Sequence, residues 1–338
     1  MTRPAVSVIM PAFNRAGFIG AAIASVRAQS MPDWELLVVD DGSSDDTLAV
    51  ARRHAAEDRR IRVAANPGKA GPGGARNHAA ALARGEWLAF LDSDDLWEHE
   101  KLALFLDAAA ARPAMVASDY VTLDRDSGAV TRLRDFILGV MMPWWRNDEL
   151  AAAAIPCARI DGAFAAIAEP DVLLSMTIGG GLWIHTSSAM VRTDLFRRVG
   201  GFDPGLIRTE DFDLWMKIFG LGPVAYLDHA LATYDVTGRN RVDGPRYGAE
   251  RRHTPYVEAR YHLRLLRRIP ARFALSRPQR TFLQARIAAH HRMCAERAGP
   301  GIARIGHALM AAAGSPRLRR LRAAAGGPSR RRPSSKRP

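Results

Sequence analysis

The chain has 338 residues, of which 48% are hydrophobic, and this length suits one large α/β domain with an extension or two small domains. Cys157 and Cys294 match no metal or redox spacing, so the sequence predicts no disulfide framework and a reducing compartment. We find no signal peptide and no apolar run of about 18 residues, the length needed to cross a bilayer. We therefore expect a cytoplasmic protein.

The net charge of +13 is concentrated near the carboxyl terminus. Residues 250–338 carry 22 basic and 3 acidic side chains, whereas residues 1–249 carry 26 basic and 32 acidic ones. The basic region contains neither interleaved aromatic residues nor a recognised nucleic-acid motif. We therefore do not expect a nucleic-acid partner, and we place the candidate site in the mildly acidic part.

The first hundred residues alternate between buried-strand and amphipathic-helix patterns. We predict strands at 6–10, 34–39, 61–64 and 88–91, and helices over 18–29, from 47, and from the glycine-rich loop to 83. This rhythm is typical of parallel βαβ units. The predicted fold class is therefore α/β, with a Rossmann-like, mostly parallel sheet flanked by helices.

Acidic residues follow two of these strands directly. Asp40 and Asp41 come after the second, and Asp92, Ser93, Asp94 and Asp95 come after the fourth. Ligands of open α/β sheets bind outside the carboxyl ends of the strands. Three acids in four residues repel one another unless a cation lies among them, and oxygen ligands favour Mg²⁺ or Mn²⁺, the usual companions of a diphosphate. Alternatively, the second cluster is a solvated turn that caps a helix beginning near Glu98.

A glycine-rich loop at residues 66–77 opens the third helix. Such a loop can present backbone N–H groups to an anion, but this one fits neither the Walker A nor the dinucleotide-binding pattern. A flexible turn is the alternative interpretation. The sequence thus indicates an anion-binding loop without naming its ligand.

The next region continues with a predicted helix at 101–111 and a predicted strand at 115–123. Residues 131–181 have no clear period and are either buried core or an acceptor-side lid, oligomer or membrane contact. A strand-like run at 183–191 and a helical turn at 194–199 precede a helix that begins near Thr209. Glu210 and Asp211 then lie at a helix N-terminus, which stabilises an ionised carboxylate and suits a base, although the two acids could serve only as caps.

The carboxyl-terminal region is rich in arginine. Residues 254–325 have a helical pattern with expected breaks at Pro270, Pro278 and Gly299, and residues 326–338 have the composition of a disordered basic tail. Arginines alternate with apolar residues as in interfacial helices at an anionic membrane surface. A solvated helical face is the equally open alternative.

Four segments, in this order, resemble family 2 glycosyltransferases of the GT-A fold. They are VSVIMPAFNRAGFIGAAIASVRAQ, WELLVVDDGSSDDT, GPGGARNHAAALARGEWLAFLDSDDLW and TSSAMVRTDLFRRVGGFDPGLIRTEDFDLWMKI, and they span most of residues 5–220. The resemblance implies a GT-A domain at 1–242, with a donor half to about residue 125 and an acceptor half at 126–242. A helical arginine-rich extension at 243–325 and the tail at 326–338 would follow.

The resemblance also implies site residues. The metal would be Mn²⁺ or Mg²⁺, coordinated by Asp94 of the DxD triplet, with Asp92 facing the metal or the ribose. Asp211 of the Glu210–Asp211 pair would be the general base. The implied donor-binding residues are Pro11, Ala12, Asn14, Asp40, Asp41, Arg76, Asp92 and Ser93, with Arg76 against the base or the diphosphate.

One departure concerns the third protein ligand of the metal. Many relatives carry a histidine shortly after the final strand, but residues 234–241 contain none, and His229 lies outside that position. Arg239 or Arg241 could instead meet the diphosphate. The sequence leaves this ligand open.

The activity that the resemblance implies is an inverting transfer of a sugar from a nucleotide-sugar donor, with UDP as the default nucleotide, to an acceptor hydroxyl. The acceptor would be a glycan or a lipid-linked sugar in cell-surface polysaccharide or glycolipid assembly, at the cytoplasmic face of the inner membrane. The alternative is a catalytically silent scaffold or regulatory subunit that binds a sugar nucleotide. The intact acids at Asp92, Asp94 and Asp211 argue against this alternative.

Overall fold

The structure is a computed structural model that describes residues 3–132, 158–160, 163–168, 184–206, 209–236 and 255–297. The chain divides into two compact units, residues 1–251 and 252–338. None of the described helices combines the length and the hydropathy that a membrane span requires. Most of the aperiodic region 131–181, both Arg239 and Arg241, and the basic tail lie outside the described residues.

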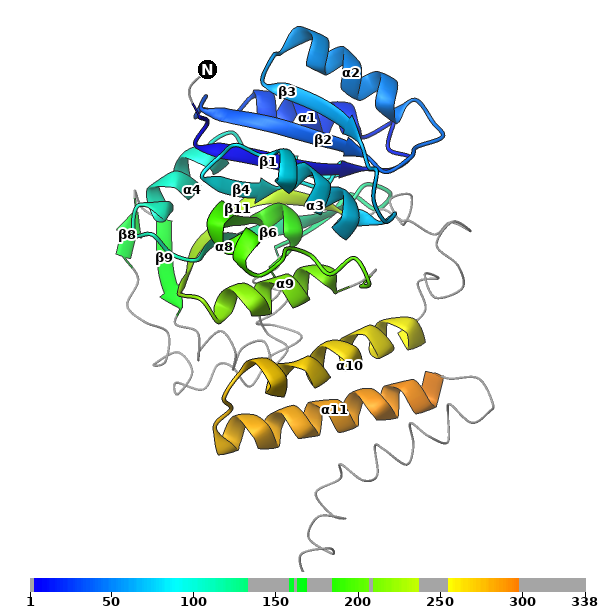
Figure 1. The fold of residues 1–338 in the computed structure, drawn as a ribbon, viewed down its shortest axis with the longest axis vertical. Helices are drawn as coiled ribbons and strands as arrows, with labels where there is room; N and C mark the ends of the chain where they lie inside the picture. Colours follow the sequence, from blue (N-terminus) through cyan, green and yellow to red (C-terminus); the bar gives the residue numbers. More distant parts are fainter. Residues whose placement is uncertain are drawn as a thin grey trace, which may run out of the picture. The chain divides into compact units, whose positions relative to one another are not determined.

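The described strands of the first unit form one mixed sheet (Figure 1). Its order is β3-β2-β1-β4-β10-β6-β11-β9-β8, while β5 pairs with β11 and β7 pairs with β6. The strands are β1 Val6–Ala12, β2 Trp34–Asp40, β3 Ile61–Ala65, β4 Trp87–Phe90, β5 Leu96–Trp97, β6 Met115–Asp124, β7 Ala129–Arg132, β8 Ala158–Ile160, β9 Ala163–Ala168, β10 Ala189–Arg192 and β11 Val224–Asp235.

The first four strands in sheet order are parallel, as the alternating pattern predicted. β10 then runs antiparallel between β4 and β6, and β6 and β11 are parallel to each other. The carboxyl ends of β1, β2 and β4 therefore meet at one edge, and the amino-terminal end of β10 lies at the same edge beside the end of β4. The candidate functional site lies at this edge of the sheet.

Helices cover both faces of the sheet, which explains why β1 and β2 are buried along their whole length. On one face lie α1 Ile19–Arg27, α2 Thr47–Glu57 and α4 Lys101–Ala109, which share an apolar core with the strands. On the other lie α3 Pro72–Leu82, α8 Thr193–Arg198 and α9 Glu210–Phe219, with a second core (Figure 1).

Two local predictions need correction. The strand expected over 183–191 begins only at Ala189, because Thr186–Ser188 form a 3-10 turn in which Ser188 donates both its N–H and its hydroxyl to the His185 carbonyl. The helix predicted over 101–111 does begin at Lys101 and not near Glu98, and no side chain caps it. The acids after β4 thus do not serve as a helix cap, and that alternative is wrong.

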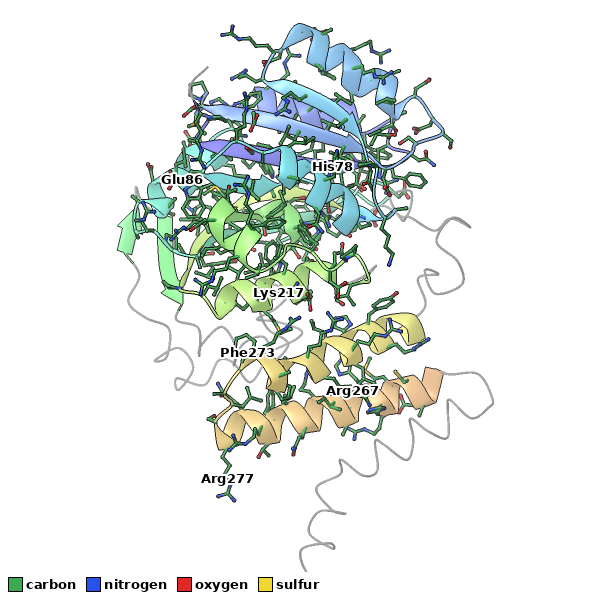
Figure 2. All side chains as sticks on the ribbon, viewed as in Figure 1. His78, Glu86, Lys217, Arg267, Phe273 and Arg277 are labelled. Atoms are coloured by element: carbon green, nitrogen blue, oxygen red, sulfur yellow. The ribbon has the colours of Figure 1, made fainter. Side chains whose placement is uncertain are left out.

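The second unit contains α10 Pro255–Arg272 and α11 Arg277–Arg297, which pack against each other. Pro270 lies in the last turn of α10, and the helix ends two residues later at Arg272, so the break expected at Pro270 falls slightly beyond it. Pro278 is the second residue of α11, where a proline is tolerated. Arg267 of α10 contacts His291 of α11, with Nη2 and Nε2 2.9 Å apart (Figure 2).

Candidate functional site

The loops after β1 and β2 bring the predicted donor residues together. β1 ends with Pro11 and Ala12, and Ala12 pairs in register with Asp40. Asn14 has a φ of 52° and accepts a hydrogen bond on Oδ1 from the N–H of Ser44 at 2.8 Å. Its own N–H donates to Ser43 Oγ at 3.0 Å. The predicted residues of this wall are therefore fixed by bonds between the two loops.

Asp40 and Asp41 are held by neutral donors. Asp40 accepts hydrogen bonds from the N–H groups of Gly42 and Ser43, each at 3.1 Å. Asp41 accepts from the N–H of Gly71 at 2.8 Å and from Asn66 Nδ2 at 2.6 Å. Both donors to Asp41 belong to the glycine-rich loop, where Gly71 has a φ of 129° that favours glycine. The loop is thus anchored to the end of β2 by Asp41.

The acids after β4 have charged or hydroxyl partners. Asp92 accepts a hydrogen bond from Arg76 Nη2 at 2.5 Å, and Asp94 accepts one from Arg15 Nε at 3.0 Å. Asp95 Oδ2 accepts from Ser187 Oγ at 2.5 Å, whereas the buried Oδ1 of Asp95 has no hydrogen-bond partner within the described part of the chain. Ser93 is buried in the same turn. A buried carboxylate oxygen without a donor is costly, so a cation at this position would be stabilising.

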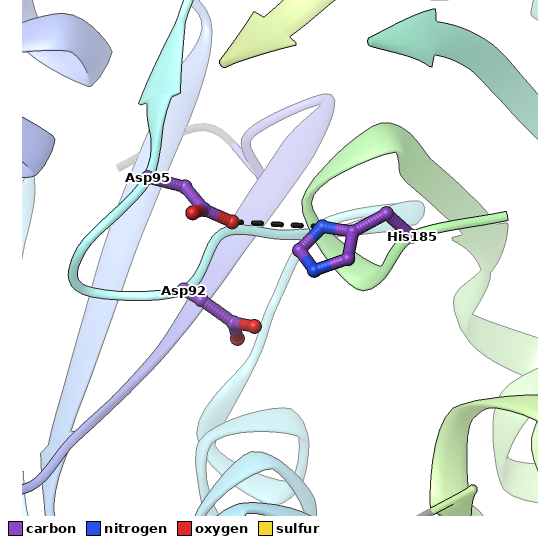
Figure 3. A group of neighbouring side chains, drawn as sticks. All are labelled: Asp92, Asp95 and His185. Carbon is purple, nitrogen blue, oxygen red and sulfur yellow. Dashed lines mark ion pairs between the residues drawn. The ribbon is translucent and has the colours of Figure 1, made fainter. Parts of the chain in front are cut away.

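His185 lies beside these carboxylates. Its Nδ1 is 3.5 Å from Asp95 Oδ2, and one ligand atom each from Asp92, Asp95 and His185 lie within 4.8 Å of one another. Figure 3 shows the imidazole ring pointing toward both carboxylates. Sequence reasoning missed His185, because it sought a histidine after the final strand, whereas this one immediately precedes the 3-10 turn before β10.

This donor set fits a divalent metal ion. Burial lowers the pKa of His185 to about 4, so the imidazole is neutral near pH 7 and has a lone pair for a metal. Burial and the charges of Asp94 and Asp92 raise the pKa of Asp95 well above its usual range. Carboxylate oxygens with one imidazole suit Mn²⁺. Asp94, the ligand that the resemblance implied, is not part of the three-residue group.

Arg76 connects the acids after β4 to helix α9. Its Nη1 donates to Glu210 Oε1 at 3.0 Å and its Nη2 to Asp92, and the guanidinium is almost fully buried. Burial alone would lower the pKa of Arg76, but the charges of Asp92 and Glu210 raise it above its ordinary value. Arg76 was predicted to contact the donor, and the structure joins it to two acids of the candidate site.

Glu210 and Asp211 form the first turn of α9, as predicted. Burial and the charge of Asp211 raise the pKa of Glu210 to about 7, and burial raises the pKa of Asp211 to about 6. The N–H of Phe212 donates to Asp211 Oδ1 at 2.8 Å and orients the carboxylate. A carboxylate whose pKa is close to neutral can accept a proton from a hydroxyl at neutral pH.

Two tyrosines line the His185 side of the site. The ring of Tyr234 lies 4.3 Å from the His185 ring, and that of Tyr120 lies 5.3 Å from it, between ring centroids. They come from β11 and β6, two strands whose adjacency only the sheet order reveals. The site therefore combines an acidic cluster with one aromatic wall.

The mixed sheet with helices on both faces matches glycosyltransferase structures of the GT-A fold. Staphylococcus aureus TarS 1–349 in complex with UDP-GlcNAc matches 85% of this chain and 72% of its own at a TM-score of 0.59 and 19% identity. Mannosyltransferase PcManGT from Pyrobaculum calidifontis, in complex with GDP-Man and Mn²⁺, matches 97% of this chain and 77% of its own at a TM-score of 0.56 and 22% identity.

The sequence comparison identifies the family. Residues 7–157 match the sequence model of Glycosyl transferase family 2, and the chain carries a family 2 glycosyltransferase domain. WfgD of Escherichia coli, a UDP-Glc:alpha-D-GlcNAc-diphosphoundecaprenol beta-1,3-glucosyltransferase, is 46% identical over 99 residues, which are 29% of this chain and 38% of WfgD. In the first three curated relatives, the segments that match this chain make up 52%, 38% and 30% of the relative's own length.

Proposed function

We propose that this protein transfers a sugar from a nucleoside-diphosphate sugar to an acceptor hydroxyl, with inversion at the anomeric carbon. The observation that carries the proposal is the group Asp92, Asp95 and His185, with its partnerless carboxylate oxygen, joined through Arg76 to the first turn of α9. These contacts support a cation site and a base within one connected cluster. Each would serve one end of a displacement reaction.

The leaving-group end is formed by the residues after β4. Asp92, Asp95 and His185 would hold Mn²⁺ or Mg²⁺, which when bound neutralises the charge that develops on the departing diphosphate. The loops after β1 and β2, with Asn14, would hold the nucleoside. Because these loops are tied to each other, their geometry is set before the donor arrives.

The acceptor end is formed by α9. Asp211 would accept the proton of the acceptor hydroxyl as the new bond forms, since its raised pKa is close to the working pH. Glu210 is tied to Arg76 and would position the turn. One base opposite the leaving group and no evident nucleophile among the described residues favour a single displacement.

UDP is the proposed donor nucleotide, and a lipid-linked sugar or a growing glycan is the proposed acceptor. The names of the related proteins support this choice, since TarS was solved with UDP-GlcNAc and WfgD is named for a diphosphoundecaprenol acceptor. Cell-surface polysaccharide or glycolipid assembly is the corresponding process.

The test compares Asp211→Asn with wild type. UDP release from a panel of UDP-sugars, with Mn²⁺ and a lipid-linked sugar diphosphate as acceptor, should fall by about 10² to 10⁴. UDP binding should stay within about twofold, because the proposed role of Asp211 is at the acceptor hydroxyl and not at the nucleotide. Asp194→Asn, at the exposed start of α8, is the matched control and should keep full activity. Unchanged turnover in Asp211→Asn would remove Asp211 from this role.

We further propose that the second unit binds an anionic membrane surface, which would bring the enzyme to lipid-linked acceptors. α10 and α11 each contain five arginines and one glutamate, and Arg264, Arg272 and Arg277 are exposed. Sedimentation of the full chain with phosphatidylglycerol vesicles at low salt should exceed that with neutral vesicles, and the variant with these three arginines changed to glutamine should sediment less. Equal sedimentation with both vesicle types would refute this proposal.

A further inference from the structure

Arg15, in the loop after β1, is a buried cation at the acidic cluster that the proposed reaction has not used. Its Nε donates to Asp94 Oδ2 at 3.0 Å, and its Nη1 donates to the carbonyl of Asn14 at 3.0 Å. Its backbone N–H donates to Thr47 Oγ1 at 2.6 Å, which fixes the loop to the start of α2. Arg15 and Asp94 are 10% and 14% exposed at the side chain, so this is a sheltered ion pair.

The pair has a direct effect on the metal group. Asp94 is the middle carboxylate between Asp92 and Asp95, yet it is not among the residues whose ligand atoms converge. Its charge nevertheless reaches the group, because after burial it is the largest cause of the raised pKa of Asp95. Asp94 is therefore near enough to matter electrostatically but is directed toward Arg15.

A guanidinium and a divalent ion cannot both use Asp94 at low cost. At Oδ2 they would compete for the same lone pairs. At Oδ1 the ion would still lie within a few ångströms of a buried positive charge, where the repulsion is weakly screened. Metal binding through Asp94 therefore requires Arg15 to move away or to acquire an anionic partner.

We propose that Arg15 is a tethered cation that competes with the divalent ion for Asp94 and passes to the diphosphate of the donor when the ion binds. In this scheme Asp94, once released, becomes a further ligand beside Asp92, Asp95 and His185. The diphosphate supplies the anion that Arg15 needs, so donor and metal bind cooperatively. The transfer of Arg15 to the diphosphate rests on the proposed function, whereas the competition between Arg15 and the ion for Asp94 does not.

The first measurement is the affinity of the full chain for Mn²⁺ alone, from the electron paramagnetic resonance signal of free Mn²⁺. Arg15→Gln should bind Mn²⁺ on the order of tenfold more tightly than wild type, since the competing charge is gone. In Arg15→Gln/Asp94→Asn the gain, measured against Asp94→Asn, should be several-fold smaller, because no freed carboxylate is left and only the loss of the Arg15 charge remains. Arg27→Gln, which removes an exposed ion pair between the end of α1 and Glu57 of α2, should behave as wild type. Circular dichroism and thermal unfolding confirm that each variant is folded.

Equal or weaker Mn²⁺ binding by folded Arg15→Gln would overturn the proposal, as would a gain of the same size in the Asp94→Asn background. Arg15→Lys keeps the charge and should bind Mn²⁺ within about twofold of wild type. A gain in Arg15→Lys equal to that in Arg15→Gln would also contradict the role of charge.

The second measurement repeats the Mn²⁺ titrations with UDP or uridine. UDP should increase the affinity of wild type for Mn²⁺. The same increase should be several-fold smaller in Arg15→Gln. Uridine, which has no diphosphate, should not change the affinity for Mn²⁺. An increment of equal size in both proteins would refute the transfer of Arg15 to the diphosphate. Absence of UDP binding to wild type would instead refute the proposed donor, and the titrations with Mn²⁺ alone would still decide the competition.

Discussion

The loops after β2 and β4 start from the same sequence pattern and end with different chemistry. In both, acids follow a buried parallel strand at the same edge of the sheet. Asp40 and Asp41 are bonded to backbone N–H groups and an amide. Asp92 and Asp94 are bonded to guanidinium groups, and Asp95 keeps one oxygen without a partner in the described structure.

The difference lies in what each loop can still bind. Neutral donors in fixed positions hold the first pair of carboxylates as parts of a rigid wall, which suits recognition of a nucleoside. After β4, three carboxylates share the two guanidinium groups of Arg15 and Arg76, and Asp95 keeps an oxygen without a partner in the described structure. This excess of negative charge suits a metal ion. A run of acids after a strand therefore does not by itself define a metal site. Whether the acids can bind a metal ion depends on the hydrogen-bond donors and cations that surround them.

The largest expected effect separates the two loops by metal affinity. Asp92→Asn should weaken Mn²⁺ binding by at least about 100-fold, because it removes an ionised ligand. Asp40→Asn should change it less than about twofold, since Asp40 already accepts two N–H bonds. Isothermal titration calorimetry measures both. Similar losses in the two variants would erase the proposed difference between the loops.

The second effect concerns pH and involves the acids connected to the metal group. Glu210 has a pKa of about 7 in the folded protein against an ordinary value of 4.5, so between these values the folded state binds more protons than the unfolded one. The free energy of unfolding of wild type, relative to Glu210→Gln, should therefore decrease as pH rises from about 4.5 to 7.

Urea unfolding of both proteins at several pH values, without added metal, measures this difference. Because Glu210→Gln shares every other titrating group, their contributions cancel to first order in the comparison. A difference that is constant across the window, or that increases with pH, would contradict the raised pKa.

The smallest effect is on stability alone and belongs to the loop after β2. Asp41→Ala should lower the free energy of unfolding by about 2 kcal/mol, because Gly71 N–H and Asn66 lose their acceptor. Asp107→Ala, at an exposed position of α4, should stay within about 0.5 kcal/mol of wild type. Urea unfolding at pH 7 gives both values. A loss as small as that of the control would show that Asp41 does not anchor the glycine-rich loop.

The local features of the site were predictable. The apolar runs that end in acids placed Asp40, Asp41, Asp92 and Asp94 at one edge, and the position of Glu210 at a helix start was evident from the pattern that follows it. These predictions succeed because the spacing of apolar residues, which distinguishes strands from helices, can be read from residues that are close together in the sequence. The resemblance to family 2 glycosyltransferases was likewise carried by short segments, of which the first three lie, except for Val6, in the part of the chain that the family model matches.

Only the tertiary structure decided which of these residues face one another. His185 joins Asp92 and Asp95 because β10 inserts antiparallel beside β4, and no local pattern encodes a strand order. Arg76, which also contacts Asp92, is separated from its partner Glu210 by 134 positions in the sequence. Arg15 is separated from its partner Asp94 by 79. The sequence determined the strands, the helices and the acids at their ends. The sheet order determined the partners of those acids, because charge pairing depends on distances in space that sequence separation does not set.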